Sequence, residues 1–145
     1  MPSTRLNELI PVLQVAIGPV ILISGVGLLL LSLTNRFGRA VDRSRQLNRE
    51  LRDAGDADRT RLAGQIKVLY RRAKLIQLSI ILGTFSVLFA AVLIIVLFFT
   101  ALLELELAVF ISLLFICCLL SLIASLVTFI MDLRLSLKAL KLELE

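Results

Sequence analysis

The sequence predicts an all-α membrane protein with three transmembrane helices and a cytoplasmic antiparallel helical hairpin between the first and the second. Hydrophobic residues make up 59% of the 145 residues, and the mean hydropathy is +0.97. A single small soluble core could not bury so much apolar side chain. The charged residues are clustered and leave three long stretches without any charge. This segregation is typical of a chain whose apolar segments cross a lipid bilayer.

The three uncharged stretches cover residues 12–34, 75–103 and 107–131. A helix rises about 1.5 Å per residue, so about 20 residues cross the roughly 30 Å of hydrocarbon in a bilayer. The alternative for the first stretch is a cleaved signal peptide, since Arg5 precedes it. Glu8 and Pro11 lie in its flank, and it ends in Leu-Leu-Ser-Leu-Thr, which is not a small-residue cleavage site. We therefore expect one membrane domain over residues 1–145 with three spans.

The basic residues predict the orientation of these spans. Residues 35–74 contain twelve lysines and arginines against five acidic residues. Because Lys and Arg stay on the cytoplasmic side of a membrane, this segment and the tail 132–145 are expected in the cytoplasm, with the N-terminus outside. The same rule explains the net charge of +5, so nucleic acid is not an expected partner.

The cytoplasmic segment 35–74 has the pattern of two amphipathic helices. Apolar or small residues recur at spacings of three and four in each half: Ala40, Ser44, Leu47, Leu51 and Ala54, then Leu62, Ile66, Leu69, Ala73 and Ile76. Between them, Ala54-Gly55-Asp56-Ala57-Asp58 supplies an expected glycine C-cap and then an aspartate N-cap. No proline interrupts residues 35–53 or 60–103, so the first two membrane helices are expected to continue into this hairpin. Leucines on one face predict a cytoplasmic amphipathic helix over residues 132–145.

Each expected membrane helix has small or weakly polar residues along one side, which let helices approach closely in lipid. They are Gly18, Gly25 and Ser32 in the first, Ser79, Gly83, Ser86 and Ala90 in the second, and Cys118, Ser121, Ser125 and Thr128 in the third. Most of these residues are expected to make contacts within one chain. Three such faces in so small a bundle also leave surface for contacts between subunits, so we expect self-association. Cys117 and Cys118 are expected to be buried small residues.

Several polar or helix-breaking residues are candidates to line a pore in a homo-oligomer. Pro19 removes the backbone donor that would bond the carbonyl of Val15, and two interpretations stay open: a kink for packing or a cation site. Glu104 and Glu106, at the outer turn, form either an acidic ring around a pore or a solvated turn. The pore-lining candidates are Gln14, Gly18, Pro19, Ser24, Asn35, Glu104 and Glu106.

The densest charged motif follows the first span and has the chemistry to bind anionic lipid or an acidic protein. Arg36, Arg39 and Arg43 lie on one helical face, and Asp42 can reach Arg39 or a partner helix. Arginine binds lipid phosphates through paired N–H donors. Asp132, where the third span leaves the membrane, is expected to pair with an arginine of the hairpin.

The chain is not expected to be an enzyme. It has no histidine, and we find no paired carboxylates within the spans, no nucleophile beside a base and no phosphate-binding glycine loop. No catalytic residue, metal ligand or cofactor is therefore expected. Two functions stay open: a homo-oligomeric ion-conducting pore lined by the first helix, and a membrane scaffold or regulatory subunit that binds anionic lipid or an acidic partner through the basic hairpin.

Residues 16–27 (AIGPVILISGVG), followed by Thr34-Asn35-Arg36, Arg39 and Asp42-Arg43, carry a family resemblance. In these residues the chain resembles a domain-of-unknown-function family of small bacterial inner-membrane proteins with three predicted spans. The resemblance covers nearly the whole chain and is most specific in the Thr-Asn-Arg to Asp-Arg motif. It implies a bacterial inner membrane and no established chemistry, so no catalytic residues follow from it.

Overall fold

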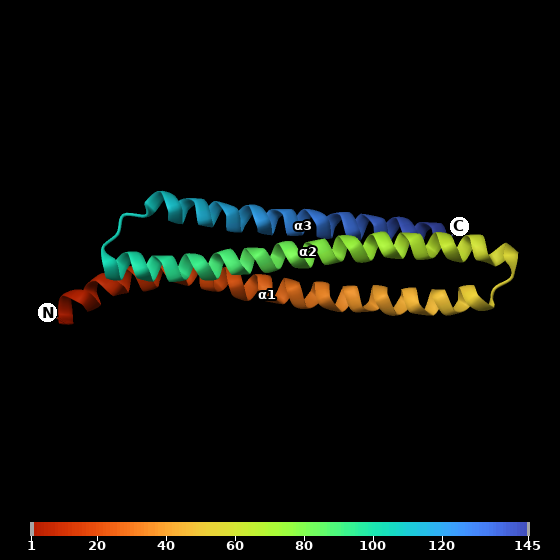
Figure 1. Ribbon diagram of the computed structural model, residues 1–145, viewed down its shortest axis with the longest axis horizontal. Coiled ribbons are helices and arrows are strands. Elements are labelled where there is room, and N and C mark those ends of the chain that lie inside the picture. Colours follow the sequence, from red (N-terminus) through yellow and green to blue (C-terminus); the bar gives the residue numbers. More distant parts are fainter. Residues whose placement is uncertain (1, 145) are drawn as a thin grey trace. The chain divides into compact units, whose positions relative to one another are not determined.

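The computed structural model describes the backbone of residues 2–144 and the side chains of residues 6–141. It consists of three helices, α1 (Pro2–Asp53), α2 (Asp56–Leu103) and α3 (Ala108–Leu144), and no strand occurs among residues 2–144 (Figure 1). Each helix is long and apolar enough to cross a membrane. The prediction of an all-α membrane protein with three candidate spans is therefore confirmed.

The helices extend beyond the uncharged stretches at several ends. α1 has 52 residues and continues through Pro11 and Pro19 and on to Asp53, while α2 has 48 residues. The tail is not a separate element, because α3 continues through residues 132–144 without a break. The limits of the membrane-embedded parts within these long helices stay predictions.

The described chain forms two compact units, each built from parts of all three helices. One contains the chain up to Leu30 together with Leu82–Ile123, and we call it the outer unit. The other contains Leu31–Ile81 and the chain from Ala124 onward, and we call it the inner unit. The two names follow the predicted orientation, which stays a prediction.

In the inner unit, α1 and α2 pack through the apolar residues that the spacing predicts. Leu47, Leu62 and Leu69 form a buried group that we call the Leu47 cluster, against which Leu51, Ala54 and Ile66 pack. Buried residues recur every seven positions: Leu33, Ala40 and Leu47 on α1, and Leu62, Leu69 and Ile76 on α2. This interval is the heptad repeat of helices that pack knobs into holes. Only residues 54–55 separate α1 from α2, and both helices are candidate spans along nearly their whole length, so a separate cytoplasmic hairpin stays a prediction.

Serine and cysteine side chains join α2 to α3. In the inner unit, the Ser79 hydroxyl donates to the Ser125 carbonyl and the Ser125 hydroxyl donates to the Ser79 carbonyl, both at 2.7 Å. In the outer unit, the Ser86 hydroxyl donates to the Cys118 carbonyl at 3.1 Å, and the Ser121 hydroxyl donates to the Leu82 carbonyl at 2.6 Å. Hydroxyls that reach a neighbouring backbone require closely spaced helices, so the small residues of α2 and α3 make the contacts predicted for them.

The small residues of α1 make no such contacts within the described chain, and contacts between subunits stay a prediction for them. Gly18, Gly25 and Ser32 are exposed, and α1 instead buries Ala16, Pro19, Val26 and Leu33. A Cβ atom added at Gly18 or Gly25 would meet nothing within 4 Å, so no other helix of the chain approaches these glycines closely. The predicted burial is wrong for Cys117, which is exposed, whereas Cys118 is buried and donates from Sγ to the Ser86 carbonyl at 3.2 Å.

The two connections end the helices in different ways. Glu104 follows α2 with a φ of 53°, and the Leu105 N–H bonds the Thr100 carbonyl at 3.3 Å, which is the Schellman pattern. Gly55 does not adopt a positive φ, contrary to the expected glycine C-cap. The Gly55 carbonyl instead accepts from the N–H groups of Asp58 and Arg59, so Asp56 is the first residue of α2 rather than its N-cap.

Candidate functional site

A buried carboxylate joins all three helices in the inner unit. Asp132 of α3 is 0% exposed, and its Oδ2 accepts from Nη2 of Arg36 on α1 at 2.8 Å and from Nε of Arg36 at 3.3 Å. Nε of Arg72 on α2 lies 3.5 Å from the other oxygen, Oδ1. We call these three residues the Asp132 cluster. The expected pairing of Asp132 with an arginine of the hairpin is confirmed, and the structure adds a second arginine.

The two arginines do not contribute equally to the Asp132 cluster. Arg36 makes two charge-assisted hydrogen bonds, and its guanidinium also lies 5.5 Å from the centre of the Phe129 ring. Nε of Arg72 and Oδ1 of Asp132 face each other as an ion pair, but both are buried without a hydrogen-bond partner. Arg36 is therefore the stronger partner, and Arg72 supplies mainly a nearby positive charge.

The Asp132 cluster changes the interpretation of the charged motif after the first span. Arg36, which the sequence places with the lipid-binding candidates, is half-buried and bound to Asp132. Arg39, Asp42 and Arg43 are exposed, and Nη1 of Arg43 donates to Oε1 of Gln46 at 3.2 Å. Thus Arg36 holds α1 against α3, and the remaining residues of the motif are the ones accessible to lipid or a partner.

The pore-lining candidates lie mostly on the exterior of the single chain. Gln14, Gly18, Ser24 and Asn35 are exposed, as are Glu104 and Glu106 in the outer connection, whereas Pro19 is buried. The Ser24 hydroxyl donates to the Val20 carbonyl one turn earlier at 3.2 Å. Lipid or another subunit beside α1 is therefore in contact with the four exposed candidates of this helix.

The surroundings of Gly18 and Pro19 are apolar. In the outer unit both residues line a hollow of about 470 Å³ formed with α2 and α3, whose walls include Leu93, Leu97 and Phe115. Ser112 is a hydroxyl residue in this lining, and its hydroxyl donates to the Ala108 carbonyl at 2.9 Å. Of the two interpretations of this proline, the surroundings favour a packing role over a cation site, because cations need several oxygen ligands.

An exposed stripe along α1 has the spacing of a helix-packing surface. Its members alternate at steps of four and three: Gln14, Gly18, Ile21, Gly25 and Leu28. All five are exposed, and Ile21 and Leu28 reach 64% and 71%. We call this stripe the glycine face. Alternating large residues and glycines at heptad spacing provide knobs and the spaces that receive them.

Comparison of the chain with known proteins identifies a family. Residues 16–142 match the family described as Protein of unknown function (DUF2721). No curated protein and no solved structure matches the chain. The matched range includes the Asp132 cluster and all but the first residue of the glycine face. Since the match covers well over half of the 145 residues, the chain belongs to the Protein of unknown function (DUF2721) family.

Proposed function

We propose that the protein is a homo-oligomer of the bacterial inner membrane in which the α1 helices surround an ion-conducting pore. The observation that supports this proposal best is the glycine face, because a single chain leaves it exposed although its spacing is that of a packing surface. Lipid chains cannot fill regularly spaced glycine positions as well as an interlocking helix can. A second copy of α1 provides such a helix.

In the proposed orientation the N-terminus and residues 104–107 are outside, and the hairpin and the C-terminus are in the cytoplasm. The twelve basic residues between positions 35 and 74 support this orientation, as do Glu104 and Glu106 at the opposite turn. The long helices then project from the membrane as a helical hairpin stabilised by the Leu47 cluster.

Polar residues beside the glycine face are placed to line a pore. With 3.6 residues per turn, Ser24 lies about 100° around the helix from Gly25, and Asn35 follows Ser24 after about three turns on the same side. In a ring of α1 helices, the surface of each helix that contacts its neighbour lies beside the surface that faces the central axis of the ring. If the glycine face contacts the neighbouring α1, then Ser24 and Asn35 point toward the axis. Glu104 and Glu106 lie at the outer mouth and Arg39 at the inner one.

Replacing Gly25 with leucine tests the oligomer and the pore together. The added side chain would occupy the space that receives a neighbouring α1, so we expect the oligomer to dissociate and ion flux in proteoliposomes to be lost. Mass photometry in detergent and a potassium-flux assay measure the two effects. Gly27→Leu is the matched control, because Gly27 is also exposed and has open space, but lies about 200° around α1.

Two results would count against this proposal. If the wild-type protein is monomeric in mild detergent and in nanodiscs, the proposed homo-oligomer is wrong. If the oligomer is intact but conducts no ions under any ionic condition, the proposed pore is wrong and only the homo-oligomer is supported.

The second candidate function is a membrane scaffold or regulatory subunit that binds anionic lipid or an acidic protein at its basic cytoplasmic side. It is favoured by the exposure of Arg39 and Arg43 on α1 and of Arg71 on α2. A stable acidic partner or bound anionic lipid that copurifies with the wild-type protein, and is lost when these arginines are changed to glutamine, would support it.

A further inference from the structure

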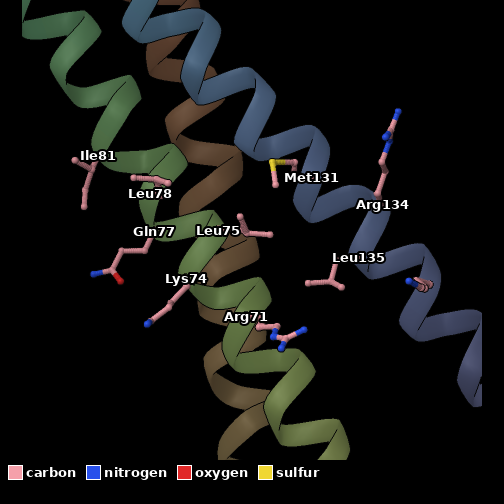
Figure 2. A pocket seen from close by; sticks show the side chains of 10 residues that line it. Arg71, Lys74, Leu75, Gln77, Leu78, Ile81, Met131, Arg134 and Leu135 are labelled. Atoms are coloured by element: carbon pink, nitrogen blue, oxygen red, sulfur yellow. The ribbon is translucent and has the colours of Figure 1, made fainter.

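The inner unit contains a groove between α2 and α3 that the predicted site residues do not include. Its volume is about 840 Å³, and its two walls come from residues 71–81 of α2 and residues 131–138 of α3. Figure 2 shows Leu75, Met131 and Leu135 in and around the space between the two helices, with the long side chains of Lys74 and Arg134 extending from opposite rims. All of its residues belong to the same compact unit.

The charges of the groove have one sign. Four exposed cationic residues line it, Arg71, Lys74, Arg134 and Lys138, and none of its described lining residues is acidic. Asp132 lies close to these α3 residues in the chain, but it is fully buried and occupied by Arg36 and Arg72. Nothing in the described lining therefore neutralises the four positive charges.

The charged and apolar residues are separated along the groove. α2 and α3 run in opposite directions here, because Ser79 pairs with Ser125 while the earlier Arg72 pairs with the later Asp132. Consequently the early residues of the α2 wall and the late residues of the α3 wall share one end, which holds Arg71 and Lys138. The opposite end holds Leu78 and Ile81 of α2, which are 45% and 44% exposed, and Met131 of α3, which is 50% exposed, lies between this end and Lys138.

We infer that this groove binds one anionic phospholipid of the cytoplasmic leaflet. The headgroup phosphate lies among Arg71, Lys74, Arg134 and Lys138, and an acyl chain passes Met131 and then follows Leu78 and Ile81 toward the membrane centre. Basic pockets between transmembrane helices on the cytoplasmic side bind anionic headgroups in this way. The inference deepens the second candidate function and relies on the proposed orientation, but it does not require a pore.

The apolar end favours a lipid over an acidic protein as the occupant. Ile81 and Met131 lie within the uncharged stretches 75–103 and 107–131, which are predicted to be in the hydrocarbon. A soluble acidic segment could reach the four cations but would leave this apolar half in contact with bulk lipid. A phospholipid matches both ends, because its charge and its hydrocarbon are separated in the same order.

A single tryptophan reports on this site, since the chain contains none. Ile81→Trp protein is reconstituted into vesicles that contain a small fraction of phosphatidylglycerol with brominated acyl chains, or of phosphatidylethanolamine brominated identically. Bromine quenches tryptophan on contact. We expect half-maximal quenching at about a tenfold lower mole fraction of the anionic lipid, since several cations attract one headgroup.

Two matched variants separate this site from general surface charge. Changing Arg71, Lys74, Arg134 and Lys138 to glutamine should abolish the preference for phosphatidylglycerol, and these exposed residues lie outside the buried core. Changing Arg45, Arg49, Arg52 and Arg59 to glutamine removes the same charge from exposed positions outside the groove and should preserve the preference. Leu88→Trp, exposed on α2 but outside the groove, should be quenched equally by both lipids.

Equal quenching of Ile81→Trp by the two lipids would overturn the inference, as would a preference that survives the change of the four groove cations. If the predicted membrane spans were wrong, the result would be different, because neither the Ile81→Trp protein nor the Leu88→Trp protein would be quenched by either lipid. Loss of ion flux or of the oligomer leaves this measurement unchanged, so the pore proposal and the lipid site fail separately.

Discussion

Replacing Asp132 with asparagine is expected to destabilise the protein by roughly 3 kcal/mol. Asparagine has nearly the same shape, so the change removes the negative charge and little packing. Arg36 and Arg72 would then remain side by side, half-buried, with no carboxylate to neutralise them. Removing one partner of a buried ion pair is costly because the remaining charge has already lost most of its water. The free energy of unfolding, measured by titration with dodecyl sulfate in mixed micelles, gives the effect.

The two arginines provide a graded test of the same cluster. Arg36→Gln should destabilise more than Arg72→Gln, because Arg36 makes both hydrogen bonds to Oδ2 and Arg72 makes none to Oδ1. In a double-mutant cycle, the Asp132→Asn and Arg36→Gln changes should be strongly non-additive, since they remove the same interaction. Asp42→Asn is the control, because Asp42 is an exposed carboxylate on α1. Equal effects of Asp42→Asn and Asp132→Asn would show that burial of the carboxylate is unimportant.

Replacing Leu47 with alanine is expected to cost about 2–5 kcal/mol. Leu47 is 2% exposed and packs against Leu62 and Leu69, so its truncation leaves a cavity where α1 meets α2. In the proposed orientation this hairpin lies in water, where burial of apolar surface drives packing. The same titration measures the change, and protease sensitivity near residues 54–55 should rise because the hairpin loses its apolar core.

The matched control for Leu47 is Leu137→Ala. Leu137 is 73% exposed on α3, so its truncation should change the free energy of unfolding by less than about 0.5 kcal/mol. If the two variants were equally stable, the Leu47 cluster would not be the core of the hairpin.

The sequence predicts the helices and the packing of α1 against α2 around Leu47 because both depend on patterns within one segment. An uncharged stretch of about 20 residues must satisfy its backbone internally in lipid, so it is helical whatever it contacts. Leu47, Leu62 and Leu69 repeat at helical intervals among charged residues, which leaves only one face to bury. The partner of Asp132 is predictable for a similar reason, since a carboxylate near the membrane needs water or a cation.

The face that α1 buries could not be predicted in this way. In lipid, apolar residues surround the whole helix, so no contrast between apolar and polar sides shows which side meets α2 and α3. Glycines favour close helix contact but do not specify the partner, and no other helix of the chain packs closely against Gly18 or Gly25. The same ambiguity explains why Cys117 was misplaced while its neighbour Cys118 was placed correctly.

The sites depend on residues far apart in the chain, and this limits what a sequence can indicate. Arg36 has the appearance of a free phosphate ligand until Asp132, 96 positions later, is seen beside it. Arg71 and Lys138 are likewise inconspicuous in sequence, and only the opposite directions of α2 and α3 bring them to one end of a groove. The clue available in the sequence is that both flank uncharged stretches at their predicted cytoplasmic ends.

Labelling of single cysteines in spheroplasts tests the three-span arrangement most directly. With Cys117 and Cys118 replaced by serine, Gly55→Cys and Leu105→Cys each place one thiol in a connection between helices. A membrane-impermeant maleimide should label the Leu105→Cys protein in intact spheroplasts and the Gly55→Cys protein only after the membrane is permeabilised. Labelling of the Gly55→Cys protein in intact spheroplasts would contradict the cytoplasmic hairpin, and labelling of both proteins from one side would contradict the span between the two positions.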